Sequence, residues 1–260
     1  MNGTVYTEVE EMCRLLRLDL SADEFAAFVE REGFTPGQTA AIGAMFRHLG
    51  DKKNETIINT LLKMSRLPIK DPKTFEGFDF SQVHGRSADK LRSLPQLSAL
   101  YAHRNLAFIG PQGVGKTHLA MAYGRECCLN GLKTYFLKAS ELDQKLTDAR
   151  RYGHIGSVVN SLVKPSCLII DEIGRCEFNE YNTRLFFDVI DRRTAKEGPN
   201  TIIFTSNKTP KDWRPYFHED DSLLCALDRA FDDATVFMFR GDSYRGRKLE
   251  TISLEVGPRK

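Results

Sequence analysis

The sequence predicts an α/β domain with a central parallel sheet flanked by helices, preceded by a small all-helical N-terminal domain. From about residue 104, short apolar runs alternate with helical patterns, whereas the first 66 residues show helical periodicity without strands. Strands that alternate with helices indicate a parallel sheet covered on both faces. A chain of 260 residues has room for one medium domain and a small appendage.

Composition places the chain among ordinary globular proteins. Hydrophobic residues make up 41% and charged residues 28%, so disorder is not indicated. The net charge of +2 is too small to indicate nucleic-acid binding by itself. The six cysteines show no CxxC spacing, and no apolar run approaches the roughly 18 residues of a membrane span. We therefore expect a cytoplasmic protein with reduced thiols and no membrane partner.

The N-terminal module is predicted to span residues 1–66. Apolar residues recur at helical spacing near 12–16, 25–29 and 57–62, which indicates three helices. Ser21 and Glu24 fit a capping box at the start of the second one. Eight Lys/Arg against ten Asp/Glu in this module do not favour a polyanion and leave a protein partner equally open.

A connector at 67–80 contains two prolines and precedes the α/β domain at 81–260. The predicted strands of that domain are NLAFIG, TYFLK, CLIIDE, TIIFTSN and TVFMFRG. Helices are expected after the first strand, ending at Asn130 and Gly131, and around RLFFDVIDRR at 184–193.

A phosphate-binding motif joins the first strand to the first helix of this domain. Gly110, Gly115, Lys116 and Thr117 match G-x-x-x-x-G-K-[ST] in the strand-to-helix context that the motif requires. Its glycines let backbone N–H groups face phosphates, the lysine neutralises the outer phosphates, and the threonine hydroxyl ligates Mg²⁺. We therefore predict ATP and Mg²⁺ as cofactors. The residues expected at the nucleotide are Gly110, Pro111, Gly113, Val114, Gly115, Lys116, Thr117 and His118.

Polar residues end two further strands. Asp171 is the predicted ligand to the metal, directly or through water, while Glu172 points to the other side and could deprotonate the attacking water. Asn207 could hydrogen-bond the γ-phosphate or that water. The alternatives are an exposed strand end for the two acids and an ordinary turn for the asparagine.

These motifs together resemble the IstB/DnaC branch of the AAA+ ATPases, and the resemblance covers about residues 73–248. It rests on GPQGVGKT, LIIDE, TSN, LDR (227–229) and RGDSYR (240–245). The last of these, together with KTFEGFDF at 73–80, is more similar to the IstB-type transposition helpers. The resemblance implies an AAA+ P-loop NTPase fold, with the two acids as the Walker B pair and Asn207 as sensor 1.

The resemblance also assigns two arginines. Arg229 takes the position of an arginine finger that reaches the nucleotide of a neighbouring subunit, and Arg245 takes the sensor 2 position. A guanidinium at the γ-phosphate stabilises transition-state charge, so hydrolysis would require ATP-dependent self-association into an oligomer. The alternative for Arg229 is a surface salt bridge, for instance with Asp232 or Asp233.

Residues 133–164 contain six Lys/Arg and three Asp/Glu, a local net charge of +3. In the resembling family this insertion faces DNA, where lysine and arginine contact phosphates. The candidate DNA contacts are Lys138, Lys145, Arg150, Arg151 and His154. The alternative is a solvated helix face without a partner.

Three functions were weighed. The first is an ATP-dependent DNA-binding regulator of transposition that assembles on duplex target DNA and recruits or stimulates a transposase. The second is a DnaC-like loader of a replicative helicase, in which the N-terminal module docks on the helicase. A small-molecule kinase is disfavoured, because Glu172 would direct ATP to water and no acceptor pocket is recognisable.

Overall fold

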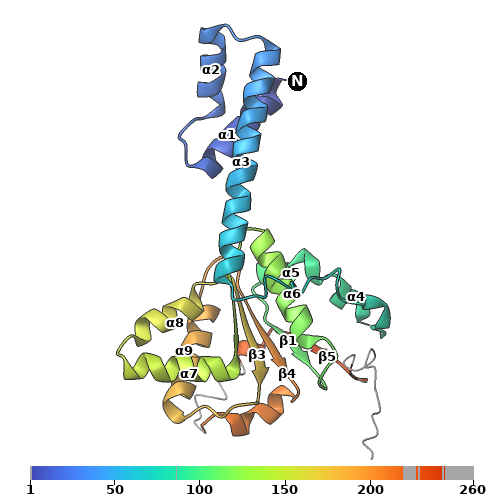
Figure 1. The fold of residues 1–260 in the computed structure, drawn as a ribbon. Coiled ribbons are helices and arrows are strands. Elements are labelled where there is room, and N and C mark those ends of the chain that lie inside the picture. The colour runs from blue at the N-terminus through green and yellow to red at the C-terminus, as the bar shows by residue number, and fades with distance from the viewer. Residues whose placement is uncertain (1, 86, 219–226, 228, 242, 244–260) are drawn as a thin grey trace, which may run out of the picture.

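The computed structural model describes the chain except residues 1, 86, 219–226, 228, 242 and 244–260. Its N-terminal part contains helices α1 (Asn2–Leu16), α2 (Ala22–Glu32) and α3 (Pro36–Met64). Figure 1 shows α1 packed along the far part of α3, with α2 packed against α1, while the other end of α3 reaches α6 and β2 of the sheet domain. The three predicted helices are present, but the third is much longer than the periodicity at 57–62 indicated.

Helix caps set the ends of these helices. The Ser21 hydroxyl accepts a hydrogen bond from the Glu24 amide at 3.2 Å, and the Glu24 carboxylate accepts one from the Ser21 amide at 2.8 Å, so the predicted capping box is confirmed. Thr35 and Gln38 form a second box at the start of α3. The small core of this head consists of Val9, Cys13, Phe25 and Val29.

The predicted connector packs against the sheet domain. Leu67 and Phe75 are 7% and 6% exposed and belong to the core on one face of the sheet. The Ser65 carbonyl accepts a hydrogen bond from the Phe136 amide at 2.8 Å. Four short helical turns follow before the first strand: η1 (Phe80–Gln82), α4 (Ala88–Arg92), η2 (Leu94–Gln96) and α5 (Ser98–Tyr101). The connector therefore closes one side of the domain.

The sheet has five parallel strands in the order β2-β3-β4-β1-β5. The strands are β1 (Leu106–Ile109), β2 (Thr134–Lys138), β3 (Cys167–Ile173), β4 (Thr201–Ser206) and β5 (Thr235–Met238). Each coincides with one of the five predicted runs, so the predicted parallel sheet is confirmed. Because β4 inserts between β3 and β1, the carboxyl ends of these three strands lie side by side.

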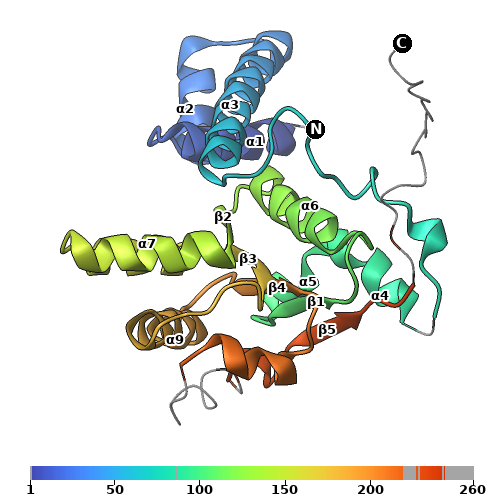
Figure 2. The ribbon, with the colours of Figure 1, turned by 60° about the horizontal axis from the view of Figure 1, so that its bottom comes forward.

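Helices cover both faces of the sheet, as Figure 2 shows. Helix α6 (Lys116–Leu129) packs with the short turns on one face, and its predicted end at Asn130 and Gly131 is confirmed. The other face is covered by α7 (Ala139–Arg151), α8 (Ile155–Val163) and α9 (Glu180–Thr194). A further 3-10 segment, η3 (Pro210–Tyr216), follows β4. No helix in the described part of the chain is long and apolar enough to span a membrane.

A buried arginine fastens α9 to the sheet. The Arg193 side chain is 0% exposed, and burial lowers its pKa to about 10. Its guanidinium donates to five backbone carbonyls, those of Leu162, Val163, Pro165, Ser166 and Thr201. These oxygens lie at the end of α8, in the turn before β3 and at the start of β4, so this side chain joins segments that are distant in sequence.

Candidate nucleotide site

A cavity of about 290 Å³ opens at the carboxyl ends of β1, β3 and β4. The loop between β1 and α6 forms one wall, and the residues that follow β3 and β4 form the other. Its lining includes Gln112, Gly113, Lys116, Thr117, Glu172, Arg175, Thr205, Asn207 and Lys208. Ligands of open α/β sheets bind at this edge, so the cavity lies where the motif predicted a phosphate site.

The loop requires glycine where it meets the connector. Gly115 has φ 93°, in the left-handed region, and a Cβ placed on it would lie 2.5 Å from the Phe78 ring. His118, one turn into α6, also faces the connector: its Nε2 lies 2.7 Å from the Thr74 carbonyl oxygen, and its ring contacts Phe78. His118 was predicted at the nucleotide, but the structure places it beneath the connector that covers the loop.

The ammonium group of Lys116 lies inside a cage of oxygen atoms. The residue is 7% exposed, and its Nζ donates to the carbonyls of Gly110 at 2.8 Å and Pro111 at 2.6 Å. It also donates to Oδ1 of Asn207 at 2.8 Å, although 91 residues separate the two. The predicted lysine and the predicted sensor asparagine therefore meet at one point.

Asp171 is held by two hydroxyl groups at the floor of the cavity. Its carboxylate is 2% exposed and accepts hydrogen bonds from Thr117 at 2.7 Å and Thr205 at 2.5 Å. Burial raises the pKa of Asp171, and these two hydrogen bonds partly offset the rise. Thr205 was missed from the sequence, because its contact depends on the pairing of β3 with β4.

The same oxygen groups suit Mg²⁺, which prefers carboxylate and hydroxyl oxygen together with phosphate oxygen. Thr117 and Asp171 are the residues predicted to hold it, and the structure brings them into contact. Within the described residues, no cluster of three or more His, Cys, Asp or Glu side chains could hold a metal by itself.

Glu172 turns away from Asp171, as the sequence predicted. It occupies an irregularity in the β3–β4 pairing and has φ 62°, a left-handed conformation that is strained for a non-glycine residue. Its carboxylate lines the cavity but is paired with Arg175, whose Nη1 lies 2.8 Å away. Nζ of Lys138 lies 3.6 Å from the other carboxylate oxygen. Lys138, a candidate DNA contact, is thus next to the predicted catalytic base.

Arg175 was not identified from the sequence. It lies two residues beyond the end of β3, on a turn that no simple periodicity places relative to Glu172. The turn through Gly174 brings its guanidinium back to the cavity. The sequence offered one weak indication of this pair, an arginine three residues after the candidate catalytic base.

The two arginines assigned by resemblance have different outcomes. Arg245 lies outside the described residues. Arg229 is 59% exposed at its side chain and pairs with Asp191 of α9 at 2.8 Å, so Asp232 and Asp233 were the wrong partners for the expected salt bridge. It lines a small cavity with Asn105 and Asn200, which precede β1 and β4. Arg229 therefore lies near the amino ends of the strands, away from the phosphate loop of its own chain.

The candidate DNA contacts divide into two groups. Arg150 and Arg151 end α7, and His154 follows in the turn before α8, so these three lie close together and exposed. Lys145 lies more than a turn earlier on the helix and is half-buried, while Lys138 is exposed but lies 3.6 Å from the Glu172 carboxylate. The structure thus brings three exposed candidates together at the turn between α7 and α8 and places Lys138 apart from them.

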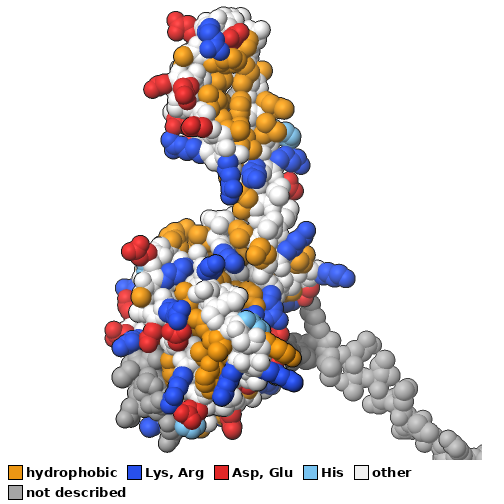
Figure 3. Space-filling view, turned by 90° about the vertical axis from the view of Figure 1, so that its left-hand side faces the viewer, with side chains coloured by type: hydrophobic (Ala, Val, Ile, Leu, Met, Phe, Trp, Pro, Cys, Tyr) orange, Lys and Arg blue, Asp and Glu red, His pale blue; other side chains and the backbone are white. Residues whose placement is uncertain are grey.

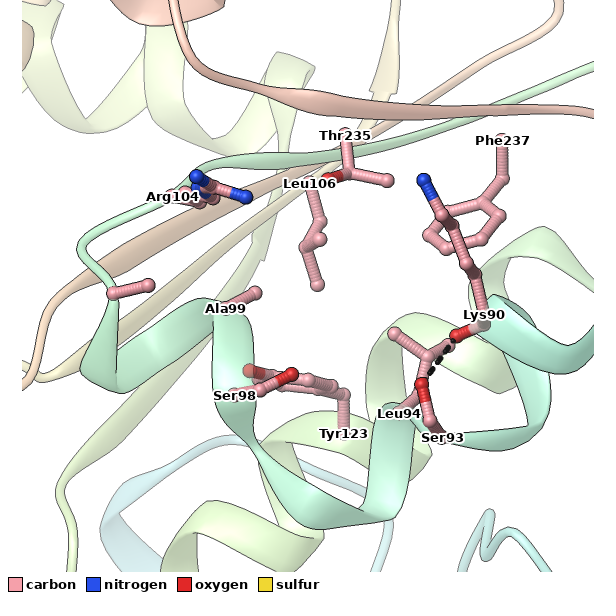
Figure 4. A pocket seen from close by; sticks show the side chains of 11 residues that line it. Lys90, Ser93, Leu94, Ser98, Ala99, Arg104, Leu106, Tyr123, Thr235 and Phe237 are labelled. Carbon is pink, nitrogen blue, oxygen red and sulfur yellow. Dashed lines mark hydrogen bonds between the residues drawn. The ribbon is translucent and has the colours of Figure 1, made fainter. Parts of the chain in front are cut away.

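A second cavity, of about 260 Å³, lies at the opposite edge of the sheet (Figure 4). The first residues of β1 and β5, Leu106 and Thr235, form part of its wall, and Tyr123 closes it from α6. The Tyr123 hydroxyl accepts a hydrogen bond from the Leu100 amide at 3.1 Å. None of the predicted nucleotide-site residues lines this cavity, so it is separate from the phosphate site.

The sheet order and the loop cavity together define an AAA+ P-loop NTPase. The fold is similar to AMPPCP-bound DnaA from Aquifex aeolicus, with a TM-score of 0.54 and 22% identity over 66% of this chain and 51% of that one. It is also similar to the DnaC helicase loader, with a TM-score of 0.50 and 18% identity over 62% of this chain and 96% of that one. At such identities the similarity establishes the fold alone.

The chain belongs to the IstB-like ATP-binding protein family, whose model matches residues 26–251. It is 33% identical over 243 residues to the ATP-binding protein of insertion sequence IS5376 from Geobacillus stearothermophilus, covering 92% of this chain and 94% of that protein. It is 35% identical to the ATP-binding protein of IS21 from Pseudomonas aeruginosa, covering 71% of this chain and 68% of that one. ATP binding is therefore the activity that family and site share.

Proposed function

We propose that this chain is a Mg²⁺-dependent ATPase that assembles on duplex DNA and stimulates the transposase of an insertion sequence. The observation that carries the ATPase part is the convergence of Lys116, Thr117, Asp171, Glu172 and Asn207 on one cavity. These groups come from three separate segments of the chain: the loop and start of α6, the end of β3 and the residue after β4. Phosphate binding, metal binding and water activation can act on one nucleotide only if the groups that perform them lie close together.

Each side chain has a defined task in this proposal. Lys116, already surrounded by oxygen acceptors, neutralises the outer phosphates. Asn207 orients the attacking water or a γ-phosphate oxygen, and Glu172 accepts the proton of that water. Bound at Thr117 and Asp171, Mg²⁺ would supply charge neutralisation for the phosphate oxygens. Because Arg175 pairs with the Glu172 carboxylate, that carboxylate must leave the ion pair before it can act as a base.

The proposed DNA contacts are Arg150 and Arg151, at the exposed end of α7. Phosphate contacts by arginine provide affinity that is independent of sequence and weakens with salt. The local net charge of +3 in residues 133–164 supports this assignment. His154, exposed in the turn that follows, extends the same surface.

Self-association is proposed from the location of Arg229. Its guanidinium lies near the amino ends of the strands, whereas the phosphate loop lies at their carboxyl ends. An arginine at this position can act on a nucleotide only if that nucleotide is bound by another copy of the chain. Turnover that requires assembly follows from this arrangement.

The relatives favour transposition over helicase loading. Relatives at 33–35% identity are named for insertion sequences, whereas the DnaC helicase loader is matched at 18% identity, where only the fold is shared. The helicase-loader alternative predicts a preference for single strands and binding of the N-terminal module to a helicase. Transposition predicts duplex binding and stimulation of strand transfer.

A combined assay tests the proposal. ATP hydrolysis and duplex binding are measured for the wild type and for Glu172→Gln, with Glu177→Gln as a control on an exposed acid outside the cavity. We expect Glu172→Gln to bind ATP and DNA but to stall hydrolysis. Strand transfer by the transposase of the insertion sequence should rise when the wild type and ATP are added. Absence of ATP turnover in the wild type with Mg²⁺ and DNA would refute the ATPase.

The DNA contacts are tested separately with the double change Arg150→Ala and Arg151→Ala. Losing two phosphate contacts should flatten the slope of log K against log salt by about 1.8, since each contact contributes roughly 0.9. An unchanged slope in a filter-binding titration would remove these residues from the DNA surface.

A further inference from the structure

Tyr152 is an exposed aromatic residue at the turn between α7 and α8. Its exposed fraction is 66%, the highest among the large hydrophobic side chains of the described residues. It joins neither hydrophobic core of the sheet domain. Water contact with so large an apolar surface is unfavourable, and burial in a hydrophobic core of the sheet domain does not offset this cost.

Charged and aromatic groups surround this ring. The Arg151 guanidinium lies 5.5 Å from its centroid, and the His154 ring lies 6.3 Å away and nearly parallel, at 13°. One residue earlier, the Arg150 guanidinium lies 4.3 Å from the centroid of Tyr181. The turn therefore presents flat, stackable groups and positive charge together.

The acidic residues of α7 do not neutralise this charge. Glu141 pairs with Arg66 at 2.9 Å, the Asp143 carboxylate accepts from Asn182 at 2.7 Å, and the Asp148 carboxylate accepts from Gln144 at 3.0 Å. In the part of the chain that the structure describes, no carboxylate forms an ion pair with Arg150 or Arg151. The end of the helix keeps its positive charge beside the exposed ring.

Figure 3 views the molecule from the side of α7 and α8. On this face, Lys and Arg side chains lie among exposed hydrophobic ones, with Asp and Glu side chains between them. A ligand that fits must offer negative charge and a flat apolar face within a few ångströms of each other. A nucleic acid has both, because each phosphate is adjacent to a base.

We propose that Tyr152 stacks on the face of an unstacked nucleobase while Arg150 and Arg151 contact the neighbouring phosphates. This assignment rests on the proposed DNA binding and adds to it a contact that phosphate attraction does not require. The base can come from a single strand or from a duplex that the protein distorts. Because every base has an aromatic face, the contact is tolerant of sequence.

The test compares three DNA probes with matched variants. Affinities are measured by fluorescence anisotropy for a single strand, an intact duplex and a duplex with a two-base bulge. The variants are Tyr152→Ala, Tyr152→Phe and, as control, Tyr101→Ala, which removes a tyrosine that is 57% exposed at the other edge of the sheet domain. Thermal melting checks that each variant is folded.

We expect Tyr152→Ala to lose about fivefold or more in affinity wherever a base is unstacked, the size of one stacking contact. Tyr152→Phe should retain binding, because the ring is preserved, and Tyr101→Ala should equal the wild type. The salt slope of Tyr152→Ala should match that of the wild type, since no phosphate contact is removed. A loss on single-stranded and bulged probes alone identifies a base that is already open. If the affinity of Tyr152→Ala for the intact duplex falls as well, and a 2-aminopurine placed inside that duplex becomes more fluorescent when the wild type binds, the protein itself unstacks the base.

Equal affinity of Tyr152→Ala and wild type on all three probes overturns the stacking contact but leaves phosphate binding by the arginines intact. Failure of the wild type to bind any probe overturns the proposed DNA function instead. If a polyglutamate peptide competes with DNA for the wild type but not for Tyr152→Ala, the ring belongs to a protein-binding surface and the assignment is wrong.

Discussion

Replacing Arg175 with alanine should raise the ATP turnover of the chain in the absence of DNA. The guanidinium of Arg175 lies 2.8 Å from the Glu172 carboxylate, the group proposed to deprotonate the attacking water. An ion pair occupies the carboxylate and holds it away from the attacking water. If Glu172 must leave this pair to act, removing Arg175 lowers the free energy needed to reach the active arrangement.

The magnitude follows from the exposure of the pair. The side chains of Arg175 and Glu172 are 52% and 33% exposed, so solvent screens their attraction. Exposed ion pairs contribute about 0.2–1 kcal/mol. With each 1.36 kcal/mol off the barrier corresponding to a tenfold change in rate, turnover should rise by about 1.4- to 5-fold. Lys138, at 3.6 Å from the same carboxylate, remains and limits the gain.

The measurement is steady-state phosphate release at saturating ATP and Mg²⁺ over a range of ionic strength. Arg192→Ala is the matched control, because Arg192 pairs with Asp188 at the same 2.8 Å and is 53% exposed, but lies on α9 outside the cavity. The gain should shrink as salt is added, since screening already weakens the pair in the wild type. A turnover that falls on removal of Arg175 while ATP affinity is unchanged would show that this arginine assists the reaction, and the reasoning would be refuted.

Three further changes test the site. Lys116→Ala should abolish ATP binding, because it removes the cation from the loop; calorimetry giving wild-type affinity would contradict the phosphate assignment. Arg229→Ala should bind ATP normally but lose the dependence of specific turnover on protein concentration, and full activity would exclude a role on a neighbouring nucleotide. Asp171→Asn should raise the melting temperature at pH 7 without nucleotide, since burial raises the pKa of Asp171 and its ionised form therefore destabilises the fold at pH values above that pKa. That difference should disappear as the pH falls below the usual carboxyl pKa, whereas a constant difference would show that charge is not its cause.

Much of the site could be predicted because its chemistry is local in sequence. The loop at 110–117 carries its glycines, lysine and threonine in one motif, and Asp171 and Glu172 are neighbours whose alternation along a strand separates their side chains. The five strands could also be predicted from the sequence, since their apolar runs are bounded by polar residues and glycine. Residue types at fixed spacing carry this information without reference to the rest of the chain.

Contacts that depend on an irregular turn or on tertiary packing could not be predicted in this way. The pairing of Arg175 with Glu172, only three residues apart, depends on a turn after an irregular strand end, and that of Arg229 with Asp191 depends on how α9 packs. The connector likewise contains prolines that indicate a loop, yet Phe75 is buried because the face of the sheet beneath it needs an apolar cover.

The sequence by itself determined which groups are available for ATP: an ammonium and a hydroxyl in the loop motif after the first strand, and two carboxylates and an amide at the ends of two other predicted strands. Only the tertiary structure decided how they meet, because the insertion of β4 between β3 and β1 brings Asn207 to Lys116 and Thr205 to Asp171. Strand order is set by packing over the whole sheet, and no local pattern encodes it.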